Sequence, residues 1–273
     1  MKIAVQNSNS CRQLSDKRFD VTHETFERSS TQQRLVLMAL EELIGSHKES
    51  SGPLRILSVG CGSGILDNQL IASVASSNRC FKYTGVDPNP VACQRFRESF
   101  EQLHLTNVEL ELKVQGIESL DINEPFDIIQ LTHALYYFKD PADALEKLRR
   151  LLASNGKLVM VHAPNEHLNQ LSECFWSHHV DHDIWFSSRL EEHLMQESMD
   201  FTRRRLKGVI DVTQCFESGC EHGEKLLDFI TQNDCRESGV EVLERCLYFL
   251  KKISRIDGSS RKVEHPADIF VVV

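Results

Sequence analysis

The sequence predicts an α/β protein centred on a doubly wound, mostly parallel seven-stranded sheet with helices on both faces. Between residues 55 and 162, five apolar segments of strand length alternate with helical patterns, as the β-α-β units of a parallel sheet do. Two further apolar runs, at 206–212 and 269–273, flank about fifty residues rich in helix formers. We therefore expect a helical lobe inserted before the last strand.

The segment before the sheet is expected to be helical. Ser29 to Thr31 offer N-cap side chains, and an apolar face that includes Met38 and Ile44 follows them. One or two helices should therefore cover residues 19–45. The polar run H-K-E-S-S-G-P at 47–53 has the composition of a surface linker.

The first strands and helices of the sheet alternate closely. Strands are expected at 55–59 and 82–86, where apolar residues precede a turn. The helix after the first strand should cover 65–74. The helix after the second should cover 90–103, because proline at its start suits the first turn of a helix. V-E-L-E-L-K-V at 108–114 alternates apolar and polar residues, which predicts the third strand.

The later elements complete the sheet. F-D-I-I-Q at 126–130 predicts the fourth strand, and the leucine-rich stretch 141–152 predicts a helix. A turn at Asn155-Gly156 should lead into the fifth strand, 157–162. The chain then divides into an N-terminal helical segment, a core built on the sheet, a helical lobe and a terminal strand. These four ranges are 1–50, 51–212, 213–262 and 263–273.

The most informative motif is a glycine loop after the first expected strand. In R-I-L-S-V-G-C-G-S-G-I-L-D, Gly60, Gly62 and Gly64 follow an apolar run, and a second apolar run ends at Asp87. Strand, glycine turn, helix, strand and carboxylate in this order build a crevice for the adenosine end of a cofactor. Glycines let the backbone approach the ligand closely. Asp87 can accept hydrogen bonds from both ribose hydroxyls.

The glycine spacing argues against two other nucleotide-binding loops. A dinucleotide loop has its third glycine at the sixth position, where this chain has Ile65. A phosphate loop has Lys and then Ser or Thr after its last glycine, and neither follows here. The remaining alternative is an ordinary tight turn between a strand and a helix. The position of Asp87 favours the cofactor site.

Composition excludes several classes of protein. The chain has 273 residues, of which 41% are hydrophobic, and a formal net charge of −9, so we expect no nucleic-acid partner. The short basic run Arg203 to Arg205 is expected at a solvated strand end. No apolar run approaches the roughly 18 residues of a membrane span, so no membrane partner is expected. The N-terminus lacks the apolar core of a signal peptide.

The cysteines and histidines indicate the compartment and the metal content. Nine cysteines form no C-x-x-C motif, which fits reduced thiols in a cytoplasmic protein. The cluster H-H-V-D-H-D at 178–183 matches no familiar zinc spacing. We therefore expect a cytoplasmic protein without a metal. We also expect a monomer.

The loop spacing G-x-G-x-G resembles motif I of the class I S-adenosylmethionine-dependent methyltransferases. H-A-L-Y-Y-F-K-D-P-A-D-A-L at 133–145 and I-D-V-T-Q-C-F-E-S-G-C-E-H-G-E-K-L-L-D-F-I-T at 210–231 resemble segments of one group in this class, the histamine N-methyltransferases. The resemblance extends from about residue 30 to the end of the chain. It implies a Rossmann-like class I methyltransferase fold, with S-adenosyl-L-methionine as the cofactor and S-adenosyl-L-homocysteine as its product.

The resemblance also implies which residues bind the cofactor. Gly60 and its loop would hold the methionine part and Asp87 the ribose. Gly116 and Ile117 would frame the adenine, and Thr132 would approach the sulfonium. The full implied set is Gly60, Cys61, Gly62, Gly64, Asp87, Pro88, Asn89, Gly116, Ile117 and Thr132.

Several positions depart from the family pattern. The family's acidic residue in the N-terminal helix falls on Gln32, and its imidazole-contacting glutamine falls on His133. Its asparagine before the last strand falls on Pro266, beside His265, and a cofactor-side glutamine falls near Ala92. Loss of the acid removes a charge-assisted hydrogen bond worth about 1.5–3 kcal/mol. A less cationic acceptor is therefore an open alternative.

The double tyrosine is retained. Tyr136 and Tyr137 follow the carboxyl end of the fourth strand, where ligands bind in such sheets, although a core pair capping the strand is the alternative. Aromatic faces tolerate the positive charge that moves to the acceptor. His133 is either a general base or a hydrogen-bonding wall. The catalytic candidates are therefore His133, Tyr136 and Tyr137. The substrate candidates are Phe26, Gln32, His133, Tyr136, Tyr137, His182 and His265, and the aromatic residues that either help them or pack the lobe are Trp176, Trp185 and Phe186.

These features together predict an S-adenosylmethionine-dependent N-methyltransferase acting on a small amine, with histamine or another imidazole or amine compound as the acceptor. Two alternatives stay open: a methyltransferase with a less cationic acceptor, and a non-catalytic paralogue that binds cofactor or amine. A metal-dependent catechol O-methyltransferase is disfavoured, because no carboxylate cluster stands near the cofactor motif to hold a cation.

Overall fold

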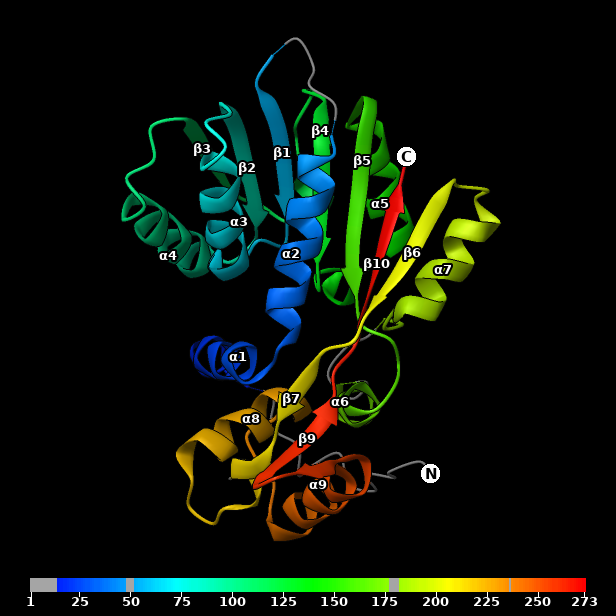
Figure 1. Cartoon of the computed structure of the whole chain (residues 1–273). Coiled ribbons are helices and arrows are strands. Elements are labelled where there is room, and N and C mark those ends of the chain that lie inside the picture. Colours follow the sequence, from blue (N-terminus) through cyan, green and yellow to red (C-terminus); the bar gives the residue numbers. More distant parts are fainter. Residues whose placement is uncertain (1–13, 48–51, 177–181, 236) are drawn as a thin grey trace. The chain divides into compact units, whose positions relative to one another are not determined.

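The computed structural model describes residues 14–47, 52–176, 182–235 and 237–273 (Figure 1). The chain forms two compact units. Unit 1 contains Met1–Gln33, Ala163–Ile184 and Leu206–Ala267, and unit 2 contains Arg34–His162, Trp185–Arg205 and Asp268–Val273. These units cross the expected ranges, because unit 1 collects three separate stretches of the chain and the N-terminal helical segment divides after Gln33.

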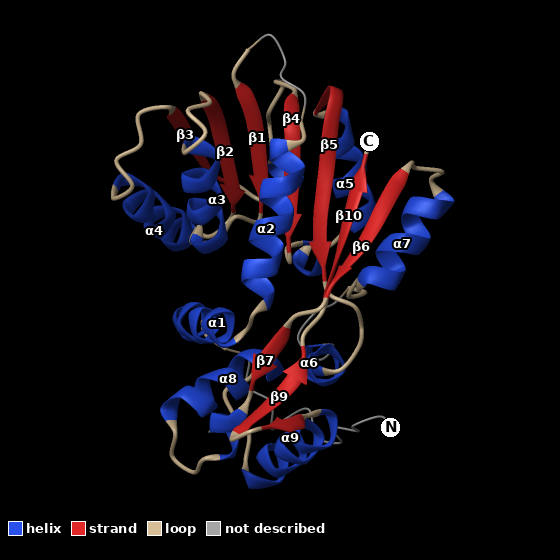
Figure 2. Ribbon diagram, in the orientation of Figure 1, coloured by secondary structure: helices blue, strands red, loops and turns tan. Residues whose placement is uncertain are grey.

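Unit 2 contains the predicted seven-stranded sheet, in the order β3-β2-β1-β4-β5-β10-β6 (Figure 2). Neighbouring strands from β3 to β5 are parallel, and β10 runs antiparallel to β5. The strands are β1 (Leu54–Val59), β2 (Phe81–Asp87), β3 (Val108–Val114), β4 (Phe126–Thr132), β5 (Leu152–His162), β6 (Phe201–Leu206) and β10 (Ala267–Val272). The predicted α/β fold class is confirmed.

Helices cover both faces of this sheet, and Figure 1 shows α2 in front of the strands and α5 behind them. The helices are α2 (Gln32–Gly45), α3 (Ile65–Ala75), α4 (Pro90–Glu101), α5 (Pro141–Arg150) and α7 (Ser187–Gln196). Leu145 and Leu148 of α5 pack with buried strand residues such as Ile129 and Phe270. Burial of these apolar side chains is the main favourable contribution to folding.

Unit 1 is smaller and combines helices with a three-stranded antiparallel sheet in the order β7-β9-β8. Its helices are α1 (Asp16–Ser29), α6 (Leu168–Trp176), α8 (Glu221–Thr231) and α9 (Val240–Ile253), and its strands are β7 (Val209–Asp211), β8 (Arg255–Asp257) and β9 (Ser260–Glu264). Phe26, Phe175 and Leu226 lie in its buried core. The expected helical lobe therefore also contains strands.

The single strand expected at 206–212 is wrong. The chain forms β6 in the large sheet and β7 in the small one, and Gly208 lies between them. A Cβ at Gly208 would lie 2.4 Å from the carbonyl oxygen of His265. The two segments therefore approach so closely that only glycine fits. The apolar pattern alone contained no sign of this crossing.

One smaller prediction is wrong and another gains a contact. Asn155 and Gly156 lie inside β5, with a register shift against β4, instead of forming a turn before the strand. The three residues of the arginine run are exposed in β6, as expected, and Arg203 and Arg205 also bind the buried carboxylate of Asp268. Burial raises the pKa of Asp268, but hydrogen bonds from Arg205, Arg203 and Ser187 outweigh it and hold that pKa below its usual value.

Other expectations concern thiols, metals and membranes. The eight cysteines in the described part of the chain are free thiols. No group of metal-binding side chains is found among the described residues. His178, His179 and Asp181 of the histidine cluster lie outside the described residues. Within the described ranges, every helix is too short or too polar to cross a membrane.

Candidate functional site

The glycine loop lies at the carboxyl end of β1, in unit 2. Gly60, Gly62 and Gly64 have φ values of +71°, +53° and +72°, which are left-handed conformations that glycine adopts without steric cost. A Cβ on Gly60 would lie 2.5 Å from the Cβ of Ala134, and one on Gly64 would lie 2.3 Å from the ring of Phe96. A Cβ on Gly62 would meet no described atom within 4 Å. The loop is therefore packed at both ends and open in the middle.

Asp87 ends β2 and connects the loop to the next helix. The N–H of Gly62 donates to one carboxylate oxygen of Asp87 at 2.9 Å, and the N–H of Asn89 donates to the other at 2.8 Å. The N–H groups of Gly60 and Cys61 both donate to the carbonyl of Val86. These bonds hold the loop against the end of β2. Each carboxylate oxygen can accept a second hydrogen bond, so the position suits a ligand with vicinal hydroxyls.

Three further residues of the expected cofactor set lie beside the glycine loop and Asp87. Asn89 caps α4 by accepting from the N–H groups of Val91 and Ala92, and Pro88 is exposed. The Cys61 thiol is buried, and its hydrogen bond with Cys93, together with burial, raises its pKa. Because this thiol is buried and bonded to Cys93, any contact of Cys61 with a ligand would come from its backbone.

The ends of β3 and β4 provide the other expected cofactor residues. Ile117 is buried in a short 3₁₀ helix, 117–119, and Gly116 precedes it in an extended conformation. Thr132 ends β4, and its hydroxyl is buried without a hydrogen-bond partner among the described residues. A buried polar atom without a partner is costly. Because the carboxyl ends of parallel strands share one sheet edge, Gly62, Asp87 and Thr132 all lie at that edge.

A buried polar network also lies in unit 2, and sequence reasoning missed it. The Tyr83 hydroxyl donates to Asp67 at 2.6 Å, and the Gln130 amide donates to Tyr83, Asp67 and Ser58. Burial, partly offset by bonds from Ser58, Tyr83 and Gln130, raises the pKa of Asp67. The network connects α3 to β1, β2 and β4. Asp67, an acid in an apolar helix pattern, was the available signal.

The double tyrosine follows β4 with His133. His133 has a φ of +53°, a left-handed conformation that histidine adopts more often than most residues other than glycine. Its Nδ1 lies 3.1 Å from the Tyr136 hydroxyl. Tyr136 is buried, whereas Tyr137 is 49% exposed. The structure thus brings His133 and Tyr136 together and leaves Tyr137 at the surface of the segment.

His162, at the carboxyl end of β5, was not predicted. Its ring stacks on Tyr136 with centroids 4.1 Å apart and planes inclined by 19°. Its Nε2 lies 2.7 Å from the carbonyl oxygen of Trp185. Phe186 lies beside Tyr136 with ring centroids 6.0 Å apart. A polar residue at the end of a buried strand was the signal in the sequence.

The remaining substrate candidates lie in unit 1. Gln32 is 3% exposed, and its amide nitrogen donates to the carbonyls of His265 at 3.0 Å and Pro266 at 3.1 Å. The Ser30 hydroxyl lies 2.7 Å from Nδ1 of His265. Both amide protons of Gln32 are therefore engaged inside unit 1. The amide can donate to both carbonyl oxygens. A carboxylate at this position only accepts hydrogen bonds, so it would face the two oxygens without a donor.

Phe26 and His182 complete the comparison with the sequence predictions. Phe26 packs its ring on Phe229, with centroids 4.6 Å apart, and edge-on against His265 at 4.9 Å. His182 is half-buried and follows α6 in the sequence. Nothing is described of the Trp176 side chain.

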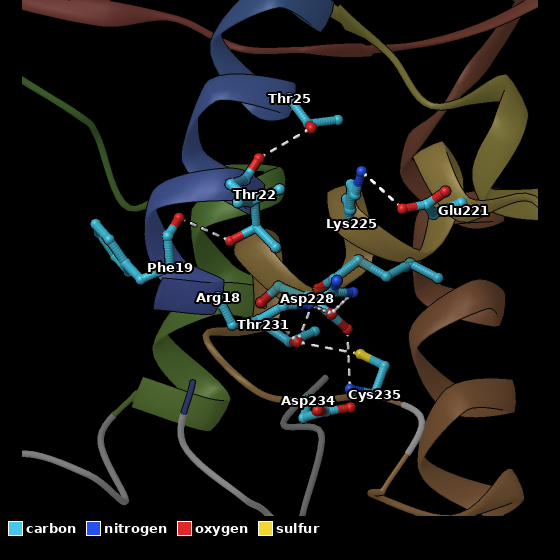
Figure 3. Close-up of polar contacts among 12 residues, drawn as sticks. Arg18, Phe19, Thr22, Thr25, Glu221, Lys225, Asp228, Thr231, Asp234 and Cys235 are labelled. Atoms are coloured by element: carbon cyan, nitrogen blue, oxygen red, sulfur yellow. Dashed lines mark hydrogen bonds and ion pairs between the residues drawn. The ribbon is translucent and has the colours of Figure 1, made fainter. Parts of the chain in front are cut away.

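The segment L-L-D-F-I-T has a structural role in unit 1 (Figure 3). Asp228 is fully buried and forms an ion pair with Arg18 of α1. Its second carboxylate oxygen accepts the N–H of Cys235 at 2.9 Å. Thr231 donates its hydroxyl to the carbonyl of Leu227 at 2.8 Å. This part of the segment 210–231 therefore connects α1 to α8.

Comparison with known proteins agrees with this geometry. The family described as "Methyltransferase domain" matches residues 27–205. Histamine N-methyltransferase of Xenopus tropicalis is 26% identical over 271 residues, covering 88% of this chain and 88% of that protein. Histamine N-methyltransferase of Rattus norvegicus is 24% identical over 241 residues, covering 80% and 82% respectively.

Two solved structures show the similarity in fold. The YcgJ protein of Bacillus subtilis has a TM-score of 0.56 and 17% identity, with 85% of this chain and 96% of that one covered. The plantazolicin methyltransferase BpumL, solved in complex with SAH, has a TM-score of 0.53 and 14% identity, with 94% and 87% covered. At these identities the comparison concerns the fold.

Proposed function

The chain belongs to the methyltransferase-domain family and uses S-adenosylmethionine as its methyl donor; from this premise we propose that it methylates a nitrogen of a small amine. Histamine is the first candidate acceptor, because proteins named histamine N-methyltransferase resemble this chain over most of its length. We also propose that the protein is a cytoplasmic monomer. It would act on a free small molecule, without nucleic acid or membrane as a partner.

The observation that carries the proposal is the geometry around Asp87. Its carboxylate holds the N–H of Gly62 at 2.9 Å, beside the part of the loop where a Cβ would meet no described atom. The unpartnered hydroxyl of Thr132 lies at the same sheet edge. We propose that Asp87 accepts hydrogen bonds from the ribose and that the open loop receives the amino-acid end of the cofactor.

When bound, S-adenosylmethionine supplies a methyl group activated by a sulfonium. The protein's contribution to such a transfer is alignment, which can lower the barrier by several kcal/mol. The acceptor nitrogen needs its lone pair, so a protonated amine has to lose a proton first. His133 is the proposed proton acceptor or hydrogen-bonding wall, and the face of Tyr136 stabilises the positive charge that the acceptor gains.

The Asp87→Ala variant tests the cofactor site by calorimetry with S-adenosylhomocysteine. Loss of hydrogen bonds to a charged group costs about 1.5–3 kcal/mol, so we expect affinity to fall by about 10- to 100-fold. Asp121→Ala removes an exposed acid of the same unit and should leave the affinity unchanged. Wild-type affinity in Asp87→Ala would contradict the proposed role of Asp87.

A second acceptor class is favoured by the contacts of Gln32. Its amide protons bind two carbonyls within unit 1, and no carboxylate stands at that position to meet an ammonium group. This supports a less cationic acceptor than histamine. Methyl transfer measured across primary amines, imidazoles and neutral heteroaromatic amines separates the two: a rate with histamine far above all others rejects the second class. A chain that binds cofactor but methylates none of them would be the non-catalytic paralogue.

A further inference from the structure

His162 lies between two parts of unit 2 that follow different strands. It ends β5, its ring stacks on Tyr136 of the segment after β4 at 4.1 Å, and its Nε2 reaches the carbonyl of Trp185 before α7 at 2.7 Å. The His162 carbonyl accepts the Ser187 hydroxyl at 3.1 Å. Both its side chain and its backbone are therefore held.

The contacts determine the chemical state of the ring. A carbonyl oxygen only accepts, so the Nε2 of His162 carries the proton that binds Trp185. The ring is 1% exposed, and burial lowers its pKa to about 3, an effect that the Trp185 bond opposes and that His133 reinforces. Asp268 is the charged neighbour from β10, paired in register with His162, and it acts in the opposite direction to burial. The ring is therefore neutral at physiological pH.

The neutral ring in turn determines how Tyr136 is presented. Stacking sets the plane of the Tyr136 ring, while its hydroxyl binds Nδ1 of His133 at 3.1 Å. An imidazolium at 4.1 Å from this ring would repel a positive charge developing on an acceptor nearby. A neutral, hydrogen-bonded imidazole supports the tyrosine without that repulsion.

We propose that His162 is a positioning residue of the acceptor site. It is anchored to Trp185 and holds Tyr136 by stacking, so that a face of the Tyr136 ring meets the acceptor. This proposal rests on the proposed methyltransferase function, because Tyr136 acts on the acceptor only if methyl transfer occurs there. Two substitutions separate the effect of the stacking ring from the effect of the hydrogen bond to Trp185. His162→Phe keeps a stacking ring but loses the bond to Trp185, and His162→Gln keeps a donor for Trp185 but loses the ring.

The turnover experiment uses the full chain with histamine as the acceptor. We expect His162→Gln to lower kcat by about 10- to 100-fold, the cost of misplacing a group at a reacting centre, with S-adenosylhomocysteine affinity unchanged. His162→Phe should recover most of this kcat while lowering the melting temperature. The control is His104→Asn, at an exposed histidine in the loop that follows α4. Equal kcat losses in both variants, or losses that follow stability or cofactor affinity, would overturn the proposal.

A second experiment does not depend on turnover. In wild-type protein with ¹³C-labelled histidine, the His162 signal should remain that of a neutral ring from about pH 5 to 8, shifted upfield by the Tyr136 ring current. Tyr136→Leu should remove the shift. A signal that titrates in this range, or one insensitive to Tyr136→Leu, overturns the proposal even if a variant fails to fold. If wild-type protein does not methylate histamine, that acceptor is rejected, and the labelled signal still decides whether His162 holds Tyr136.

Discussion

Replacement of Gln32 by glutamate restores the acid that the resemblance associates with an ammonium group, and we expect it to destabilise the protein. Gln32 is 3% exposed and donates to the carbonyls of His265 and Pro266. A carboxylate there would face two acceptors without a donor, and burial of an unpaired charge is strongly unfavourable. The variant side chain should therefore enter the site protonated.

The magnitude follows from the cost of that protonation. A glutamate with an ordinary pKa near 4.3 has to take up a proton across roughly 2.7 pH units at pH 7, which costs about 3.7 kcal/mol. The neutral carboxyl group donates one hydrogen bond where the amide donates two, a loss of about 0.5–1.5 kcal/mol. The free energy of unfolding should fall by about 4–5 kcal/mol at pH 7, summing these two costs.

The pH dependence provides the decisive test. The pKa of the new carboxyl group would be raised in the folded state, so the native state binds more protons than the unfolded state and the variant loses stability as pH rises. At pH 5 the protonation cost falls to about 1 kcal/mol. Urea unfolding followed by circular dichroism at both pH values measures this difference. Gln69→Glu, at an exposed glutamine that also binds a carbonyl, is the control. A deficit equal at pH 7 and pH 5 would refute the reasoning.

Three further outcomes are expected. Arg18→Met should lower the free energy of unfolding by about 2–4 kcal/mol, because it leaves the buried carboxylate of Asp228 without its ion-pair partner. Arg28→Met removes an exposed ion pair with Glu24 and should cost under about 1 kcal/mol. Thermal melts compare the two variants. Gly62→Ala should fold with a free energy of unfolding lower by about 1–2 kcal/mol but bind S-adenosylhomocysteine poorly. Gly60→Ala should lose more stability, because its Cβ also clashes with Ala134. Chemical unfolding measures the stability of each variant and calorimetry its affinity. Asp268→Asn should be less stable than wild type at pH 7, because this carboxyl group, whose pKa is lowered in the folded state, stabilises the fold while it is ionised. The difference should begin to shrink as pH falls below about 4, the ordinary pKa of an aspartate, and should be lost as pH falls through the lowered pKa of the folded state. Unfolding measured from pH 7 down to pH 3 follows it.

The core of the sheet could be predicted from the sequence because its signals are local. V-E-L-E-L-K-V alternates with the period of a strand, and β3 covers 108–114 as expected. The glycine loop and Asp87 were identifiable for a similar reason: the order strand, glycine turn, helix and strand brings them to one sheet edge in any parallel sheet. The roles assigned to these residues stay predictions until the ligand is measured.

The parts that sequence reasoning missed depend on residues far apart in the chain. Gly208 separates two strands because His265 crosses beside it, and Gln32 serves as a donor because two carbonyls near the end of the chain face it. His162 joins the acceptor side through Tyr136, 26 positions away. By itself, the sequence determined the α/β sheet and the place of the cofactor motif, since periodicity and turn chemistry act between neighbours. Only the tertiary structure decided which polar side chains are engaged, because hydrogen-bond partners and burial are set by segments that meet after folding.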